Sequence, residues 1–305
     1  MRDAVARVWA GEAELSYGQG ALLLVGSGFV FSFTALLFRG LDGATDWQFL
    51  TVRGLGMALA MVTVVWLRRR TRPINLAAAG WATVVAGVLM AAMSTLYVLA
   101  LARTTAAMTT AFLAAGPFSG ALFGWVLLRE RVRSRTWIAL GLATVGIAVI
   151  VSGGLDAGSA AGVLLAAAIP VLLGLYNVLV RSTPEVDPVV PALIGGAMLA
   201  LVAGTVAASA SGLSMSMRDL ALGATAGFVI LGLGLPMFNL GHRSVPTAQV
   251  SLLIMTEIVL TPLWVWIWPG ETPSISTLIG GAVIITAVVW QVTGAERVAL
   301  RHPVV

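Results

Sequence analysis

Long apolar runs alternate with short polar clusters along the chain, and this pattern predicts membrane-spanning helices. A helix that crosses a bilayer needs about 20 mostly apolar residues. Runs of about this length lie between clusters rich in Arg, Pro, Gly and acidic residues, at 20–38, 46–67, 76–101, 104–128, 136–152, 160–180, 189–210, 219–240, 246–268 and 276–293. The connections are short, so no room remains between these runs for a soluble catalytic domain.

The second half of the chain resembles the first at an offset of 141 residues. At this offset Trp125 matches Trp266 and Glu130 matches Glu271. Each half holds five runs, an odd number, so the second half must enter the membrane from the opposite side. The predicted fold class is therefore an all-α integral membrane protein with ten transmembrane helices in two inverted five-helix repeats. We expect a tail at 1–19, the first repeat at 20–152, the inverted second repeat at 160–293 and a tail at 294–305.

Composition and charge agree with a membrane protein. The chain is 59% hydrophobic and 10% charged, with a mean hydropathy of +0.97, which excludes a water-soluble globule, a coiled coil and a disordered chain. The sequence contains no Lys, and 14 of its 18 Arg residues fall on the side of the N-terminus. Only Arg39, Arg103 and Arg218 fall on the other side, and Arg53 lies inside the second run. Because cytoplasmic loops keep positive charge, we expect a bacterial inner (plasma) membrane protein with both termini in the cytoplasm.

The residue types needed for catalysis and metal binding are scarce. The chain has no Cys and only two His residues, His242 and His302, which excludes disulfides, cysteine metal sites and multi-histidine sites. Serine chemistry needs a nearby base, and no Gly-x-Ser-x-Gly elbow accompanies His242. We therefore expect no enzyme, no catalytic residues, no metal and no cofactor. An intramembrane enzyme remains the alternative of another class. The net charge of +5 is explained by the arginines expected in the cytoplasmic loops. It therefore gives no indication of nucleic-acid binding, and we expect no nucleic-acid partner.

Residues 97–153 resemble the end of an EamA-type repeat of the drug/metabolite transporter superfamily. The likeness rests on a turn of small residues, Pro117, Glu130, Arg131 and a Gly-rich fifth run that contains Gly141. The second half resembles the same pattern through Glu257, Gly270, Glu271 and Gly280. Two positions depart from the pattern, because Ile258 stands where Pro is expected and Arg129 replaces a Gly.

Within this superfamily the chain is most similar to YddG-type exporters of aromatic and other amino acids. The resemblance implies a secondary transporter that exports small amphipathic metabolites by alternating access. Its expected partners are the lipid bilayer and a small-molecule substrate, an amino acid or a related metabolite. Because a repeat within one chain supplies the two-fold relation that shorter relatives obtain by dimerising, we expect a monomer. The alternative is a proton-coupled multidrug efflux carrier, which has the same architecture.

Glu257, Arg53 and His242 are the ionisable candidates for substrate binding or proton coupling. By helical rise Glu257 lies about 16 Å from either end of the ninth run, and an acid at such depth is a functional candidate by default. The alternative is a neutral carboxyl bonded to a neighbouring helix. Arg53 lies about 9 Å into its run, and we expect it to extend to the outer interface. Its alternatives are pairing with Glu257 and binding a substrate carboxylate. His242 is a proton carrier or an interfacial residue.

Polar and aromatic residues inside the runs complete the expected substrate pathway. The full set is Phe29, Phe33, Trp81, Ser94, Tyr97, Tyr176, Asn177, Asn239, Glu257, Thr261 and Trp264. At helical spacing Glu257, Thr261 and Trp264 share one stripe. Packing against lipid is the alternative for Phe29 and Phe33, and an anchoring belt at the membrane interface is the alternative for Trp264.

Helix breaks are expected where Pro and Gly interrupt the runs, because transporters expose backbone groups to substrate at such points. The candidates are Pro117, Pro170, Gly232, Gly234 and Pro236. The last three predict an irregular turn near the middle of the eighth run.

Overall fold

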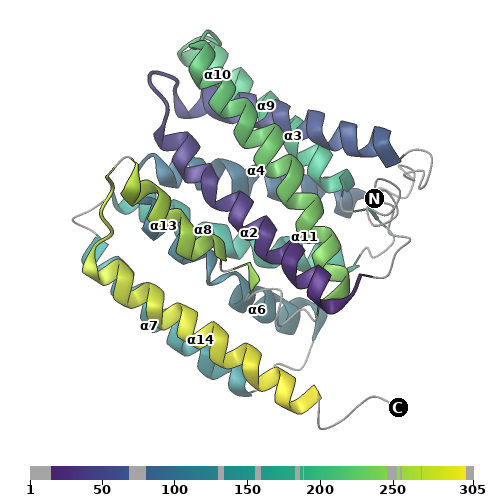
Figure 1. Cartoon of the computed structure of the whole chain (residues 1–305), viewed down its shortest axis with the longest axis vertical. Helices are drawn as coiled ribbons and strands as arrows, with labels where there is room; N and C mark the ends of the chain where they lie inside the picture. The colour runs from purple at the N-terminus through teal and green to yellow at the C-terminus, as the bar shows by residue number, and fades with distance from the viewer. Residues whose placement is uncertain are drawn as a thin grey trace.

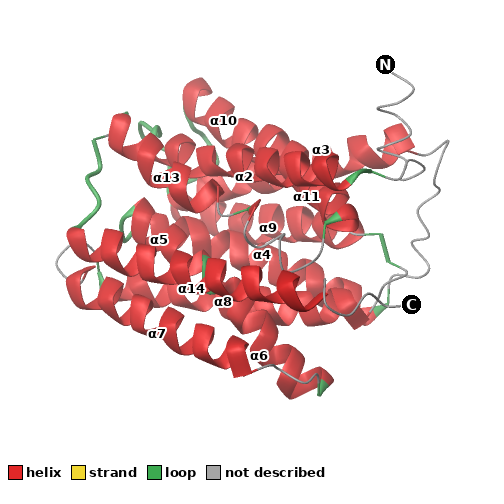
Figure 2. Cartoon of the chain, turned by 60° about the horizontal axis from the view of Figure 1, so that its bottom comes forward, coloured by secondary structure: helices red, strands yellow, loops and turns green. Residues whose placement is uncertain are grey.

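The computed structural model describes residues 15–68, 80–129, 134–154, 159–182, 186–187, 189–245, 253–254, 256–268 and 270–299. All regular secondary structure in these residues is helical (Figure 2). Within these ranges, seven helices are long and apolar enough to cross a membrane, and three shorter apolar helices accompany them. The chain is therefore a multi-pass membrane protein.

The helices of the first half coincide closely with the predicted runs. They are α2 (Tyr17–Arg39), α3 (Asp46–Arg68), α4 (Trp81–Leu101), α5 (Ala106–Leu113), α6 (Gly116–Leu128) and α7 (Ser134–Gly154). The run at 104–128 is not continuous, since Ala114 and Ala115 separate α5 from α6. Pro117 lies in the first turn of α6, where its missing N–H group costs no helical hydrogen bond.

The second half contains α8 (Ala160–Ser182), α9 (Val189–Ala210), α10 (Met217–Ala224), the π-helix η2 (Thr225–Leu231), α11 (Gly232–Ser244), α13 (Thr256–Ile267) and α14 (Ile275–Ala299). The irregular turn predicted at Gly232, Gly234 and Pro236 is wrong in position, because α11 runs through all three residues. The irregularity is the π-helix, which ends directly before Gly232. Pro170 lies inside α8, which continues on both sides of it.

The two halves of the chain pack against each other helix by helix. Helix α2 packs on α11 and α13, whereas α8 packs on α4 and α6. Helix α3 packs on α9, and α7 packs on α14. The pair α7 and α14 runs along one edge of the molecule, on the far side from α3 (Figure 1). Residues of both halves therefore line every main helix interface.

Glycine permits the closest of these approaches. A Cβ atom on Gly54 of α3 would lie 2.5 Å from the backbone nitrogen of Ala200 in α9. On the facing helix, a Cβ atom on Gly196 would lie 2.8 Å from the backbone nitrogen of Ala58. Small residues at helix interfaces let backbones approach in this way inside membranes, where van der Waals packing replaces the hydrophobic effect as the driving force.

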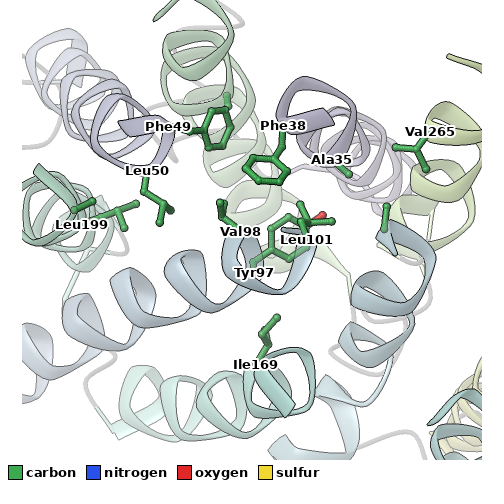
Figure 3. Packing of buried hydrophobic residues seen from close by; sticks show 13 residues of the cluster. Ala35, Phe38, Phe49, Leu50, Tyr97, Val98, Leu101, Ile169, Leu199 and Val265 are labelled. Atoms are coloured by element: carbon green, nitrogen blue, oxygen red, sulfur yellow. The ribbon is translucent and has the colours of Figure 1, made fainter. Parts of the chain in front are cut away.

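The largest buried core among the described residues is centred on α2, α3 and α4 and also includes residues of α5, α8, α9, η2 and α13. Phe38, Phe49, Tyr97 and Leu101 all belong to it (Figure 3). The rings of Phe38 and Phe49 meet edge to face, with centroids 5.4 Å apart. This core holds Tyr97 in place, and the ring of Tyr97 lies beside Arg53 of α3.

Candidate functional site

Arg53 of α3 points into the helix bundle. Only 5% of Arg53 is exposed, and its Cζ atom lies 5.9 Å from the centroid of the Tyr97 ring on α4. This distance suits a cation–π interaction, which gains strength where water is excluded. The expectation that Arg53 extends to the outer interface is therefore wrong. The physical reason is that an aromatic face on a neighbouring helix receives the guanidinium inside the protein.

Arg53, Ser94 and Tyr97, called here the Arg53 cluster, hold polar atoms without partners. Nε and Nη1 of Arg53, the Ser94 hydroxyl and the Tyr97 hydroxyl are buried and make no hydrogen bond to any residue that the structure describes. Ser94 and Tyr97 lie three positions apart on α4, hence on one face. Each unsatisfied buried group costs roughly 1–3 kcal/mol, so a native protein needs a reason to keep several together.

Glu257 is half-buried and lies in the first turn of α13, which begins at Thr256. The expected depth of about 16 Å from either end assumed one continuous helix over 246–268. It is wrong, because Ile254 lies in a turn and α13 starts after it. A Cβ atom on Gly28 would lie 3.3 Å from the backbone nitrogen of Glu257, so α2 passes close to the acid. Glu257 and Arg53 carry opposite charges, and pairing between them was one alternative that the sequence offered. Among the ion pairs that the described residues form within 4.0 Å, none joins these two. The direct pair that the sequence offered as an alternative is therefore not formed.

Three aromatic rings, called here the aromatic cluster, lie between α2 and α13. Phe33 stacks on Trp264 with centroids 5.1 Å apart and an interplanar angle of 14°. Phe29 meets Phe33 edge to face at 5.1 Å and meets Trp264 in the same way at 6.3 Å. The pathway residues Phe29, Phe33 and Trp264 thus come together, although they derive from opposite halves of the chain.

Trp264 is half-buried and is held by α2, unlike a tryptophan of an interfacial belt. Its indole N–H donates a hydrogen bond of 2.9 Å to the Ser32 hydroxyl of α2. Thr261, fully buried, donates to the Ser32 carbonyl at 3.4 Å. Trp266 and Trp268 are exposed, as membrane anchors are. Thr261 and Trp264 lie four and seven positions after Glu257 and so share one side of α13. This side therefore packs on α2.

Trp81 does not join these clusters. It is the first residue of α4 and is 76% exposed. By helical rise it lies about 20 Å along the axis from Ser94. Its inclusion in the pathway followed from residue type alone, and its exposure is that of an interfacial tryptophan.

The remaining pathway candidates lie on α8 and α11. Tyr176, Asn177 and Asn239 are half-buried. A Cβ atom on Gly120 of α6 would lie 3.6 Å from Nδ2 of Asn177, so this amide faces α6. The Ser119 hydroxyl of α6 donates to the Pro170 carbonyl of α8. The side chains of His242 and Pro117 lie outside the described part of the structure.

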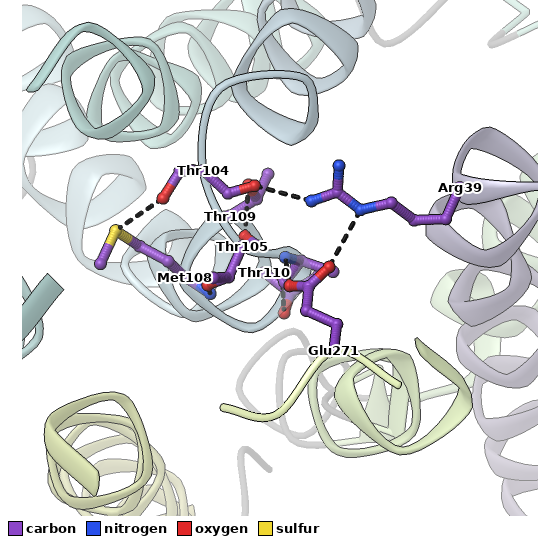
Figure 4. A network of polar contacts seen from close by, with 8 residues as sticks. Arg39, Thr104, Thr105, Met108, Thr109, Thr110 and Glu271 are labelled. Carbon is purple, nitrogen blue, oxygen red and sulfur yellow. Dashed lines mark hydrogen bonds and ion pairs between the residues drawn. The ribbon is translucent and has the colours of Figure 1, made fainter. Parts of the chain in front are cut away.

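A polar network joins α2, the α4–α5 connection and the segment between α13 and α14 (Figure 4). Arg39 donates from Nε to Glu271 at 2.9 Å and from Nη2 to the Thr104 carbonyl at 2.8 Å. The other oxygen of Glu271 accepts from the Ala106 backbone N–H at 2.5 Å. Sequence reasoning identified Glu271 only as a repeat landmark and did not connect it with Arg39. The available signal was charge, since Arg39 is one of only three arginines expected on the side of the membrane opposite the N-terminus.

Further polar contacts stabilise the connections beside this network. Arg103 lies 3.7 Å from Asp46, and Asp219 is buried. The two Asp219 oxygens accept from the backbone N–H groups of Asp42 at 2.9 Å and Ala44 at 3.0 Å. These contacts tie the α2–α3 connection to α10 and account for the burial of Asp219. Among the described residues, no group of three or more His, Asp or Glu side chains could hold a metal ion.

Comparisons with known proteins add to this geometry. No curated protein matches the sequence at a significant level. A solved structure described only as "Crystal structure of protein" superposes with a TM-score of 0.66 and is 19% identical, covering 92% of this chain and 100% of that one. At this identity the likeness concerns the fold alone. Residues 18–152, which include α2 to α7 almost entirely, match the model of the EamA-like transporter family. The first half of the chain therefore carries the sequence pattern of that transporter family.

Proposed function

We propose that this protein is a secondary transporter that exports small amphipathic metabolites, most of all amino acids including aromatic ones, from the cytoplasm. The observation that carries the proposal is that Arg53 is buried and Glu257 half-buried in an apolar helix bundle, and that no ion pair within 4.0 Å joins them. Charged groups at such depth are costly and mark substrate or ion pathways. A zwitterion offers each of the two charges the partner that the protein does not supply.

The aromatic cluster supports an amphipathic solute. The three rings pack together between α2 and α13. The same two helices bring Gly28 close to the backbone of Glu257. Sites for amphipathic ligands combine apolar and aromatic walls with a few polar groups that fix orientation. Phosphorylated cargo fits poorly, because Arg53 is the single arginine in the interior of a predicted span.

The packing of the helices supports two inverted repeats with the boundaries 20–152 and 160–293. At the offset of 141 residues, the contacts of α2 with α11 and α13 correspond to the contacts of α8 with α4 and α6. The pairs α3 with α9 and α7 with α14 join helices that hold the same place in each half. A pseudo-two-fold axis in the membrane plane produces such a pattern, and it suits a monomer that works by alternating access.

The network around Arg39 and Glu271 supports a conformation that is closed at the outer end. The distribution of Arg residues places Arg39 and Arg103 on the outer side. Three separate segments are held together there by the hydrogen bonds of Arg39 and Glu271. In an alternating-access cycle these contacts break when the outer side opens.

Counterflow in proteoliposomes tests the proposal. Purified protein is reconstituted with an unlabelled solute inside, and uptake of labelled Trp, Phe, Met, Thr, Lys or a lipophilic cation is followed. We expect saturable exchange of neutral amino acids, with the aromatic ones preferred and the cation ignored. Exchange of no amino acid would refute the proposal.

Proton-coupled multidrug efflux is the second candidate function. The half-buried Glu257 carboxyl, which makes no direct ion pair with Arg53, favours it because a cation site needs an available acid. Exchange of the lipophilic cation alone, abolished by Glu257→Gln, would establish this function in place of amino-acid export.

A further inference from the structure

We propose that Arg53, Ser94 and Tyr97 form a carboxylate-binding subsite. The inference rests on the proposed transport function and names the chemical group by which the solute is held. All three side chains carry buried polar atoms with no partner among the described residues. Arg53 and Tyr97 are each more than nine-tenths buried.

The chemistry of the cluster calls for an anionic acceptor. A guanidinium carries only donors and keeps its charge under all ordinary conditions. Hydroxyl groups of Ser and Tyr can also donate. A site that contains only groups able to donate, one of them cationic, is matched by a carboxylate, whose two oxygens accept several hydrogen bonds.

Comparison with Arg39 argues against a purely structural role for Arg53. Arg39 is more exposed, with 25% of its side chain accessible, yet it donates to the Glu271 carboxylate and to the Thr104 carbonyl. Arg53 is 5% exposed and two of its nitrogens have no partner. A structural arginine would be satisfied most completely where it is buried most deeply. Arg53 is the more deeply buried of the two arginines and has fewer hydrogen bonds, which points to a ligand that accepts hydrogen bonds from it.

The backbone around Arg53 is held firmly, as a binding site requires. A Cβ atom on Gly227 of the π-helix η2 would overlap the Arg53 carbonyl. A Cβ atom on Gly56 would lie 2.8 Å from the backbone nitrogen of Phe228 in the same π-helix. Single-turn π-helical segments occur frequently at functional sites. Arg53 thus lies on a closely packed stretch of backbone, and a site that is ordered before binding loses less entropy on binding.

Charge balance favours a monocarboxylate with an ammonium group. Arg53 supplies one positive charge, and Glu257 on α13 supplies one negative charge that forms no ion pair with Arg53 within 4.0 Å. A dianionic phosphate would need more cations and would be repelled by Glu257. An α-amino acid places its carboxylate at the Arg53 cluster and its ammonium group toward Glu257.

Ligand-induced stabilisation and counterflow together test the subsite. Trp, indole-3-propionate, which lacks the ammonium group, and tryptamine, which lacks the carboxylate, are compared for their effect on the Tm of purified protein, since a ligand of the folded state raises Tm. We expect Trp and indole-3-propionate to raise the Tm of the wild type. In Arg53→Gln we expect both shifts to disappear and any shift by tryptamine to persist. Arg53→Lys, which keeps the charge, and Tyr97→Phe are expected to weaken Trp binding about threefold to tenfold.

Arg218→Gln serves as the matched control, because the Arg218 side chain is 63% exposed at the outer end. We expect it to keep all ligand responses of the wild type. Equal Tm shifts by indole-3-propionate in the wild type and in folded Arg53→Gln would overturn the subsite. If Arg53→Gln does not fold, unchanged Trp affinity in both Arg53→Lys and Tyr97→Phe would overturn it as well.

The outcomes also separate the subsite from the proposed function. Arg53-dependent binding of indole-3-propionate without counterflow of any amino acid would refute transport and support the subsite. Counterflow of Trp that is unchanged in Arg53→Gln would support transport and refute the subsite. No binding of either carboxylate and no counterflow would refute both.

Discussion

Arg39 and Glu271 form an ion pair of 2.9 Å across 232 positions of the sequence. The pair joins the last residue of α2 to the segment that precedes α14. Because Glu271 also accepts from the Ala106 N–H at the start of α5, its carboxylate holds three segments together. In the proposed cycle this carboxylate closes the outer end.

We expect Glu271→Ala to open the outer end more often. The substitution removes the acceptor of both Arg39 and Ala106, and for a partly exposed pair the loss is worth about 1 kcal/mol. The chain contains no cysteine, so a single Ala107→Cys substitution on the buried α5 provides a reporter. A membrane-impermeant maleimide added from outside should label this cysteine several times faster in the Glu271→Ala background. Equal labelling rates in both backgrounds would contradict a gating role.

The aromatic cluster should determine the preference for aromatic solutes. Phe33→Ala removes the ring that stacks on Trp264, and such a ring contact contributes about 0.5–1.5 kcal/mol beyond its area. We expect the KM for Trp to rise about twofold to tenfold, with the KM for Thr unchanged, in counterflow measurements. Trp266→Phe alters an exposed ring and should change neither value. A parallel loss of Trp and Thr transport in Phe33→Ala would assign the cluster a structural role instead.

Glu257→Gln removes the negative charge of this side chain and keeps its shape. We expect Trp exchange to fall at least tenfold, because the ammonium group loses its partner, while indole-3-propionate binds as well as before or better. A double-mutant cycle with Arg53→Gln should show coupling between the two positions, since one zwitterion would bind both charges. Additive effects on binding, together with unchanged transport by Glu257→Gln, would show that Glu257 is structural.

The limits of sequence reasoning are clear in these residues. The bilayer dictates a span of about 20 apolar residues, so helix positions such as Asp46–Arg68 agreed with the predicted runs. Depth along a helix follows from sequence only where the helix is continuous, and Glu257 marks the limit, because α13 begins at Thr256. The direction of a side chain around the axis depends on neighbours. Arg53 turns inward because Tyr97 lies on α4, and Trp264 differs from Trp266 because Ser32 lies on α2. For the contact between Arg39 and Glu271 charge was the available signal, whereas the contact of Trp264 with Ser32 had none.

The π-helix illustrates a different limit. Gly and Pro residues predicted an irregular turn at Gly232–Pro236, yet the irregular segment is Thr225–Leu231. A tertiary contact lies at this position, because Gly227 and Phe228 pack on the backbone of α3 at Arg53 and Gly56. Propensity within one helix carries no information about such a neighbour.

Glycine contacts between the halves should control stability in a position-specific way. Gly54→Ala places a Cβ atom 2.5 Å from the backbone of Ala200, so α3 and α9 must separate, at a cost of about 1–3 kcal/mol. We expect a lower Tm of the purified protein in detergent. Gly281→Ala is the matched control, because a Cβ atom there meets nothing within 4 Å. Inside a helix, Ala is favoured over Gly by about 0.5–1 kcal/mol, so this variant should be at least as stable as the wild type. A lower Tm in both variants would mean that helix propensity and backbone contact do not explain the effect. Equal stability of Gly54→Ala and the wild type would show that α3 and α9 do not pack closely at Gly54.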